Sequence, residues 1–216
     1  MVSCYEINET REKETETEQS LGSRTEIKEF PAQEKITIDG ESYRTDDRGI
    51  PHMYYDKTDK EHPWKLIPDN KYTSCGYEYV TDNQGRIRLA TGKLYVPQDE
   101  LREDGQHKRK PLNAKVEDME DEDQRGHVIA DVFGGSNRVD NLVAMGHLTN
   151  NLEYKALEKK FKDLVKDGHD VEVTYSLVYN LGNDTKRPDG FALYWKIDGS
   201  ADDENGKCFN KVTENY

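Results

Sequence analysis

Patterns of alternating apolar and polar residues recur along the chain and predict short β-strands with one buried face. In the first half, residues 36–39 followed by Gly40 have the pattern of a strand that ends in a turn. Residues 76–81 and 86–90 flank the turn-forming segment 82–85 and predict a hairpin. We therefore expect the first half of the folded region to be mostly β.

A strand–strand–helix pattern occupies the middle of the chain. The apolar run 127–133 predicts a short strand that a pair of glycines ends, and residues 141–145 predict a second one. A helical pattern follows over residues 151–167, and residues 170–179 and 191–197 then predict two strands that pair with each other. This order of elements predicts an α+β fold with an antiparallel or mixed sheet.

The predicted helix, residues 151–167, has recognisable ends and one apolar side. Thr149 and Asn150 are both candidates for its N-cap, and Gly168 follows its last turn as a stop signal. At about 100° per residue, one broad apolar face forms, which must pack on the preceding strands. That face consists of Tyr154, Leu157, Phe161, Leu164 and Val165.

A stripe of lysines lies on nearly the opposite side of this helix. It consists of Lys155, Lys159, Lys162 and Lys166, and Glu158 lies on the border between the stripe and the apolar face. A solvated helix face and a surface that binds phosphate both fit four lysines at this spacing.

The composition predicts one folded domain after a polar tail. Only 33% of the 216 residues are hydrophobic and 35% are charged, but thirteen tyrosines and two tryptophans supply apolar area for a core. Residues 1–32 lack apolar periodicity and predict a disordered tail or linker. Residues 33–216 are therefore the predicted domain.

Signals for targeting and for cysteine chemistry are weak. No apolar run approaches the roughly 20 residues that cross a bilayer, and the chain starts without the features of a signal peptide. Cys4, Cys75 and Cys208 are widely separated and lack the paired spacing of zinc ligands. We expect no membrane association and no function for the cysteines.

The formal net charge of -13 at pH 7 is unfavourable for a protein that binds nucleic acid. Contacts with phosphates supply most of the non-specific affinity for DNA, and a uniformly acidic surface would repel them. Nucleic-acid binding therefore requires that basic residues be concentrated locally.

The strand–strand–helix region carries the residue types of a one-metal phosphodiesterase site. His127 opens the first predicted strand, Asn150 stands where the helix is entered, and Glu158 follows about two helical turns later. A histidine near its ordinary pKa of about 6.5 can take a proton from an attacking water. Mg²⁺ prefers oxygen ligands and often takes one or two protein groups, which an asparagine carbonyl and a carboxylate can supply. These side chains can converge in a cleft between strand and helix.

These residues resemble the DNA/RNA non-specific endonucleases of the ββα-metal (His-Me finger) superfamily. The similarity is greatest to the C-terminal nuclease domains of bacterial polymorphic toxins, including those exported by type VII secretion. The matching positions are Arg125-Gly126-His127 with the Val-Ile-Ala that follows, Phe133-Gly134-Gly135, Asn141-Leu142-Val143, Asn150, and Tyr154 to Glu158. The resemblance implies a ββα-metal finger as the active site.

The resemblance also implies the roles of the residues that carry the chemistry. His127 would be the general base, Asn150 the direct ligand of Mg²⁺, with Mn²⁺ as a substitute, and Glu158 the carboxylate that holds the metal's water molecules. Asn151 competes with Asn150 for the ligand position, and Asn150 could instead serve only to cap the helix.

Other positions would bind phosphate or support the loop. Arg125 would contact phosphate or stabilise the leaving group, and Lys162 stands where related enzymes often have an arginine for the same work. The lysines assigned to the substrate phosphates are Lys155, Lys159 and Lys162, and the structural residues are Asn141, Gly134 and Gly135.

The chain departs from the family pattern at two positions. The family usually has an aspartate directly before Arg-Gly-His, but Gln124 stands there and Asp123 lies one residue further back. Lys162 in place of arginine loses the bidentate geometry that a guanidinium offers to phosphate.

The function that follows is a Mg²⁺-dependent endonuclease that cleaves DNA, with RNA as a further substrate. The toxin resemblance implies a secreted bacterial effector that acts in a target cell, and a cognate immunity protein as its partner. The alternative is an acidic interaction domain that kept the fold and lost the chemistry. A zinc-dependent HNH-type nuclease is disfavoured because no second histidine is well placed near Asn150.

Overall fold

The computed structural model describes residues 16–18, 33, 35–38, 41–44, 53–97, 115–199 and 211–214. The predicted tail therefore lies almost wholly outside the described residues, and its boundary at residue 32 stays a prediction. One piece of it is a strand, β1 (Glu16–Glu18), which pairs in parallel with β2 (Lys35–Ile38). Cys4 and Cys208 also lie outside the described residues, and Cys75 is a free thiol.

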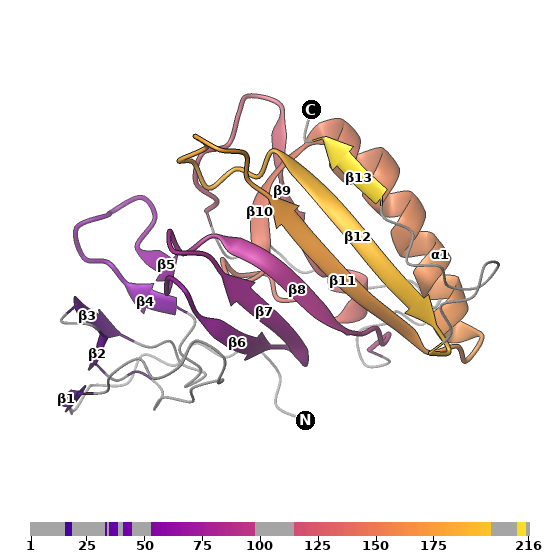
Figure 1. Cartoon of the computed structure of the whole chain (residues 1–216), viewed down its shortest axis with the longest axis horizontal. Helices are drawn as coiled ribbons and strands as arrows, with labels where there is room; N and C mark the ends of the chain where they lie inside the picture. Colours follow the sequence, from indigo (N-terminus) through magenta and orange to yellow (C-terminus); the bar gives the residue numbers. More distant parts are fainter. Residues whose placement is uncertain are drawn as a thin grey trace.

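A six-stranded antiparallel sheet forms the body of the fold (Figure 1), with strand order β13-β12-β11-β8-β7-β6. The pairing of β7 with β8 confirms the predicted hairpin, and the pairing of β11 with β12 confirms the two closing strands. The strands are β6 (Lys71–Ser74), β7 (Tyr77–Thr81), β8 (Ile87–Lys93), β11 (Val171–Val178), β12 (Gly190–Ile197) and β13 (Lys211–Glu214).

Two small sheets precede this body along the chain. The strand predicted at residues 36–39 is present as β2, which pairs with β3 (Glu41–Arg44) as well as with β1. A second pair joins β4 (Met53–Tyr55) to β5 (Trp64–Leu66).

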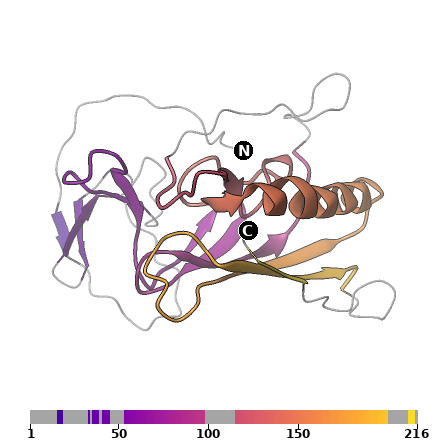
Figure 2. The same ribbon diagram turned by 90° about the horizontal axis from the view of Figure 1, so that it is seen from above.

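The strand–strand–helix unit lies on one side of the large sheet (Figure 2). It consists of the antiparallel pair β9 (Asp123–His127) and β10 (Leu142–Gly146), followed by a π-helical turn (Thr149–Tyr154) and the helix α1 (Lys155–Lys166). With the antiparallel sheets, this unit gives the α+β fold that the sequence predicts.

The first strand of this unit is not where the sequence pattern placed it. It ends at His127 instead of beginning there, and the apolar residues 128–130 are buried in an irregular segment before a 3₁₀ turn at Asp131–Phe133. The amide of Ile129 bonds to the side chain of Asn141 and not to a strand backbone. The continuous apolar run therefore indicated that these residues are buried, but it did not indicate that they form a β-strand.

The helix also begins differently from the prediction. Leu148 already has helical dihedrals (φ −65°, ψ −45°), so neither Thr149 nor Asn150 is an N-cap, and both lie inside the π-helical turn. The predicted stop at Gly168 is confirmed. That glycine has φ +91°, and the amide of His169 bonds back to the carbonyl of Leu164 at 3.0 Å.

The apolar face of α1 is confirmed, but it packs on the strands that follow the helix. The Phe161 ring is fully buried and lies 5.5 Å from the ring of Trp195 on β12. The Tyr154 ring lies 5.8 Å from that of Tyr175 on β11 and 5.5 Å from that of Phe191 on β12. The helix is thus held by β11 and β12, not by the strands before it. Among the residues that the structure describes, no helix is long and apolar enough to span a membrane.

Phe161→Ala should lower the free energy of unfolding by about 3–5 kcal/mol, because it removes a buried ring that holds the helix on the sheet. Leu152, one turn before α1, is 64% exposed and serves as the control. Leu152→Ala should change the stability by no more than about 0.5 kcal/mol. Urea unfolding followed by tryptophan fluorescence measures both, and equal effects of the two substitutions would refute this account of the packing.

Candidate functional site

His127 is paired with a buried asparagine that the sequence analysis did not select. Nε2 of His127 lies 2.5 Å from Oδ1 of Asn137, which is fully buried. Nδ2 of Asn137 lies 3.5 Å from a carboxylate oxygen of Asp131, which orients the amide with its oxygen toward the histidine. A neutral imidazole that donates from Nε2 to this oxygen has Nδ1 as its basic nitrogen.

Three buried tyrosines of the large sheet hold the loop that presents Asn137. They lie on β6 and β7 and donate hydrogen bonds to the segment between β9 and β10. Burial raises the pKa of Tyr77 and of Tyr79, which keeps both hydroxyls protonated as donors. Tyr77 donates to the carbonyl of Phe133 (2.6 Å), Tyr72 to the carbonyl of Asp140 (2.8 Å), and Tyr79 to Oδ1 of Asn141 (2.9 Å).

Asn141 closes this loop through its side chain. Its Oδ1 accepts a bond from the amide of Ile129 (2.8 Å), and its Nδ2 donates to the carbonyls of Ile129 (2.8 Å) and Ser136 (2.9 Å). Gly135 passes so close that an added Cβ would lie 1.9 Å from the carbonyl oxygen of Ile129. Gly134 has φ +76°, a conformation that favours glycine. The contacts of all three predicted support residues are with the backbone of this loop or with its neighbours.

A second polar cluster joins β9 to the start of the helix. Oε1 of Gln124 accepts hydrogen bonds from Nδ2 of Asn150 and from Nδ2 of Asn151, each at 2.7 Å. Nε2 of Gln124 lies 3.0 Å from Nδ1 of His147. The ammonium of Lys155 bonds to Oδ1 of Asn151. The departure from the family pattern at residue 124 therefore lies at the centre of this cluster.

The contacts of the two asparagines distinguish them as metal ligands. The amide oxygen of Asn151 is occupied by a lysine ammonium, whose charge would also repel a cation. Within the described part of the chain, Oδ1 of Asn150 accepts no hydrogen bond, and its only side-chain bond runs from Nδ2 to Gln124. An available amide oxygen fits a hard cation such as Mg²⁺. Among the residues described, no three His, Cys, Asp or Glu side chains gather as a metal cage.

Glu158 and Arg125 lie on different elements of the same unit. Glu158 is half-buried on α1, and its charge adds to burial in raising the pKa of Tyr175 on β11. Arg125 is exposed on β9, where it pairs with Ala144 of β10. The structure thus places His127 and Asn150 in two polar clusters joined by β9, because His127 ends this strand and Asn150 bonds to Gln124 near its start.

Asp123 does not replace the aspartate that the family usually has before Arg-Gly-His. Its carboxylate forms an ion pair with Arg187, with Nε at 2.7 Å and an Nη at 3.0 Å from its two oxygens. This pair ties the loop between β11 and β12 to the start of β9. Asp123 is therefore a structural anchor of the finger.

Three of the predicted stripe lysines carry charge that the described residues leave uncompensated. Lys159, Lys162 and Lys166 form no ion pair within the described part of the chain. Lys159 and Lys166 are exposed, and Lys162 is half-buried. The stripe is therefore a local concentration of positive charge on a protein whose formal net charge is -13.

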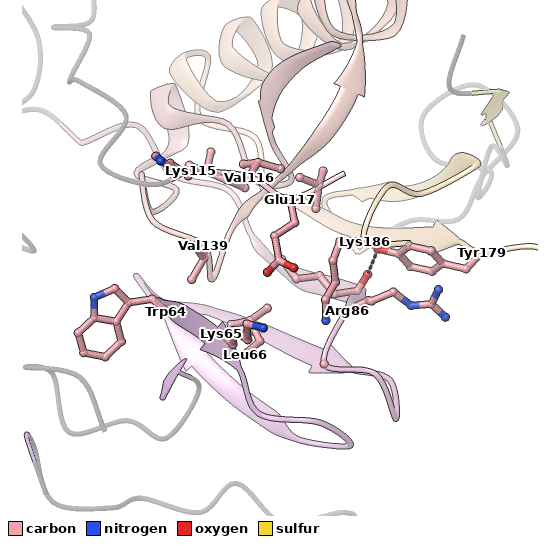
Figure 3. Close-up of a pocket in the computed structure, with 14 residues that line it drawn as sticks. Trp64, Lys65, Leu66, Arg86, Lys115, Val116, Glu117, Val139, Tyr179 and Lys186 are labelled. Carbon is pink, nitrogen blue, oxygen red and sulfur yellow. Dashed lines mark hydrogen bonds between the residues drawn. The ribbon is translucent and has the colours of Figure 1, made fainter. Parts of the chain in front are cut away.

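A pocket beside β10 gathers further basic residues but balances their charge (Figure 3). Arg86 pairs with Asp82 at 2.6 Å, and Lys65 pairs with two aspartates of the β4–β5 hairpin. Burial lowers the pKa of Lys186, whose ammonium lies in the field of Glu117. Arg86 and Lys65 in this pocket are therefore held by carboxylates of the fold.

A family model for DNA/RNA non-specific endonucleases matches residues 68–199, which include both polar clusters. The chain belongs to the DNA/RNA non-specific endonuclease family. The match also covers the large sheet except for β13, so the tyrosines that hold the loop between β9 and β10 lie in the segment that matches the family.

Curated relatives of this endonuclease domain are type VII secretion system proteins. EssD of Staphylococcus aureus, strain USA300, is 32% identical over 143 residues, which is 63% of this chain and 22% of the relative. EssD of strain Newman matches equally well. The chain thus spans about a fifth of the length of these relatives.

Solved nucleases are also similar to the endonuclease. Metal-free NucA from Streptococcus agalactiae has a TM-score of 0.47 and 15% identity, and the match covers 67% of this chain and 82% of that one. The magnesium-bound form of that protein has a TM-score of 0.44 and 16% identity, over 67% and 81%. Sda1 nuclease with a bound zinc ion has a TM-score of 0.40 and 14% identity, over 79% and 86%.

Gly135→Ala should destabilise the endonuclease by about 3 kcal/mol or more, because the new methyl group would overlap a backbone carbonyl that cannot move aside. Gly168→Ala is the control: its φ is +91°, but no atom lies within 4 Å of an added Cβ. Its cost should be that of the left-handed conformation, about 1–2 kcal/mol. Urea unfolding compares the two variants, and a Gly135→Ala variant as stable as Gly168→Ala would contradict the close approach.

Proposed function

We propose that the protein is a metal-dependent endonuclease that hydrolyses phosphodiester bonds in DNA, with RNA as a further substrate. The observation that carries this proposal is the combination of an oriented histidine and an available amide oxygen in one strand–strand–helix unit. Both lie within the segment that matches the endonuclease family.

In this proposal His127 is the general base. Its Nδ1 takes a proton from the attacking water, and the bond from Nε2 to Asn137 keeps the ring in the tautomer that makes this possible. When the ring becomes positively charged, the amide oxygen of Asn137 still accepts the Nε2 proton and stabilises the imidazolium. Asn137 is a positioning residue in this scheme.

Asn150 would hold the metal through Oδ1, and Glu158 would hold water molecules of the metal from its place two turns into the helical segment. Mg²⁺ bound there supplies stabilisation of the negative charge that develops on the phosphate, and Mn²⁺ can replace it. Arg125, with Lys159 and Lys162 of the stripe, would contact the substrate phosphates. Lys155 is a weaker candidate for that role because its ammonium bonds to Asn151.

The biological setting proposed is that of a secreted bacterial toxin. The similarity to type VII secretion system proteins, of which the matched segment is about a fifth, supports this setting. A nuclease of this kind would endanger the cell that makes it, so a cognate immunity protein is part of the proposal.

Purified protein should degrade plasmid DNA with Mg²⁺ and lose this activity in EDTA. His127→Ala should lower the rate by about 10²- to 10⁴-fold, the usual contribution of a general base. His169→Ala is the matched control, because His169 is exposed and pairs with Asp198 away from the finger. If wild-type protein leaves DNA and RNA intact with Mg²⁺ and with Mn²⁺, the alternative of an inactive acidic domain replaces this proposal.

Replacement of Asn137 should change the pH dependence of cleavage. In Asn137→Asp a carboxylate faces His127 and favours the imidazolium, so the pKa of the base rises. Because the neutral base is the active form, the acidic limb of the rate profile should move to higher pH. Asn137→Ala should instead lower the rate without that shift. A profile of Asn137→Asp that overlays the wild-type profile would exclude the positioning role, whatever the stability of the variant.

A further inference from the structure

We propose that Lys155, Asn151 and Gln124 form a chain of hydrogen bonds that turns the carbonyl oxygen of Asn150 toward the metal. Gln124 is then a positioning residue for the metal ligand. This inference rests on the proposed function, because it takes Asn150 as the ligand.

Lys155 determines which atom of each amide donates and which accepts along this series of hydrogen bonds. An ammonium group can only donate hydrogen bonds, so the atom of Asn151 that faces it must be Oδ1. The other end of the Asn151 amide, Nδ2, then points to Gln124 at 2.7 Å. A single cation thus fixes an amide orientation that would otherwise have two choices.

The orientation of Asn151 determines that of Gln124, which in turn determines that of Asn150. Because Nδ2 of Asn151 is a donor, the atom of Gln124 that faces it must be Oε1. The same Oε1 lies 2.7 Å from the amide of Asn150, which must therefore present its own Nδ2. Oδ1 of Asn150 is left on the far side of that amide, where no described residue bonds to it.

His147 is consistent with the same direction. Its Nδ1 lies 3.0 Å from Nε2 of Gln124 and 3.1 Å from Nδ2 of Asn151, so two donors face one acceptor nitrogen. Nδ2 of Asn151 also lies 3.2 Å from the carbonyl oxygen of His147, so its two hydrogens face three acceptors, all consistent with this orientation of the amide. A reversed Asn150 amide would set two carbonyl oxygens against each other at hydrogen-bond distance, which is unfavourable.

The glutamine also explains how the site works without the usual aspartate. A carboxylate could accept from Asn150 but could not donate to Nδ1 of His147. Compared with an aspartate, Gln124 lacks one negative charge near the proposed metal site, but it can form a second hydrogen bond, to His147. In this proposal the hydrogen bonds of Gln124 orient the metal ligand Asn150, and no negative charge at position 124 is needed.

Binding of Mn²⁺ alone to the full chain, followed by electron paramagnetic resonance, tests the proposal. Gln124→Met keeps the shape of the side chain and removes both bonds, so it should weaken Mn²⁺ binding by about 10- to 100-fold. Gln124→Glu keeps the acceptor for Asn150 and should bind at least as tightly as wild type. Asn150→Ala should lose the site. Thermal unfolding of each variant separates loss of the ligand from loss of the fold.

The lysine is tested with a charge-matched pair. Lys155→Met should weaken Mn²⁺ binding although it removes a positive charge, because it frees the amide of Asn151 to reverse. Lys166→Met removes the same charge at the other end of α1 and should leave binding unchanged or slightly stronger.

The outcomes separate this inference from the proposed function. If Asn150→Ala binds Mn²⁺ as wild type does, the proposed metal site is wrong. If Asn150→Ala loses binding and folded Gln124→Met keeps wild-type affinity, the site stands and the positioning role of Gln124 is refuted. Tighter binding by Lys155→Met would refute the role of the lysine in setting the direction of the chain.

Discussion

The rest of the candidate site depends on the hydrogen bonds of the buried Asn141 side chain. Its bonds to Ile129, Ser136 and Tyr79 replace strand pairing just after β9 and connect the finger to the large sheet. A buried amide that is satisfied at both ends favours one conformation, because any rearrangement leaves polar atoms without partners. The position of His127 at the end of β9, and of Asn137 opposite it, follows from that closed loop.

The site therefore consists of two rigid halves with different supports. The histidine half rests on β6 and β7 through hydroxyl groups, and the asparagine half rests on β11 and β12 through the aromatic contacts of α1. β9 crosses between them and contributes a residue to each. Both supports belong to one continuous sheet, so the positions of the two halves depend on the same framework.

The sequence predicted the strands and the helix well where periodicity was strong, as in β11, β12 and the apolar face of α1 around Phe161. It misplaced the strand at His127, because a run of buried residues has no period that separates a strand from a buried loop. It also missed Asn137, which lies in a short irregular segment and becomes informative only when the fold brings it to His127. Gln124 was noticed as a departure from a pattern, but its three partners come from a different element 23 or more positions away.

The order of the elements along the chain has a consequence for synthesis. The helix that carries the amide cluster packs on strands that are made after it, and Asp123 is tied to Arg187 in the loop between those strands. A short helix is marginal without tertiary contacts, so its orientation is not fixed until β12 has left the ribosome. A chain that lacks β11 and β12 therefore lacks the aromatic partners on which the helical segment packs.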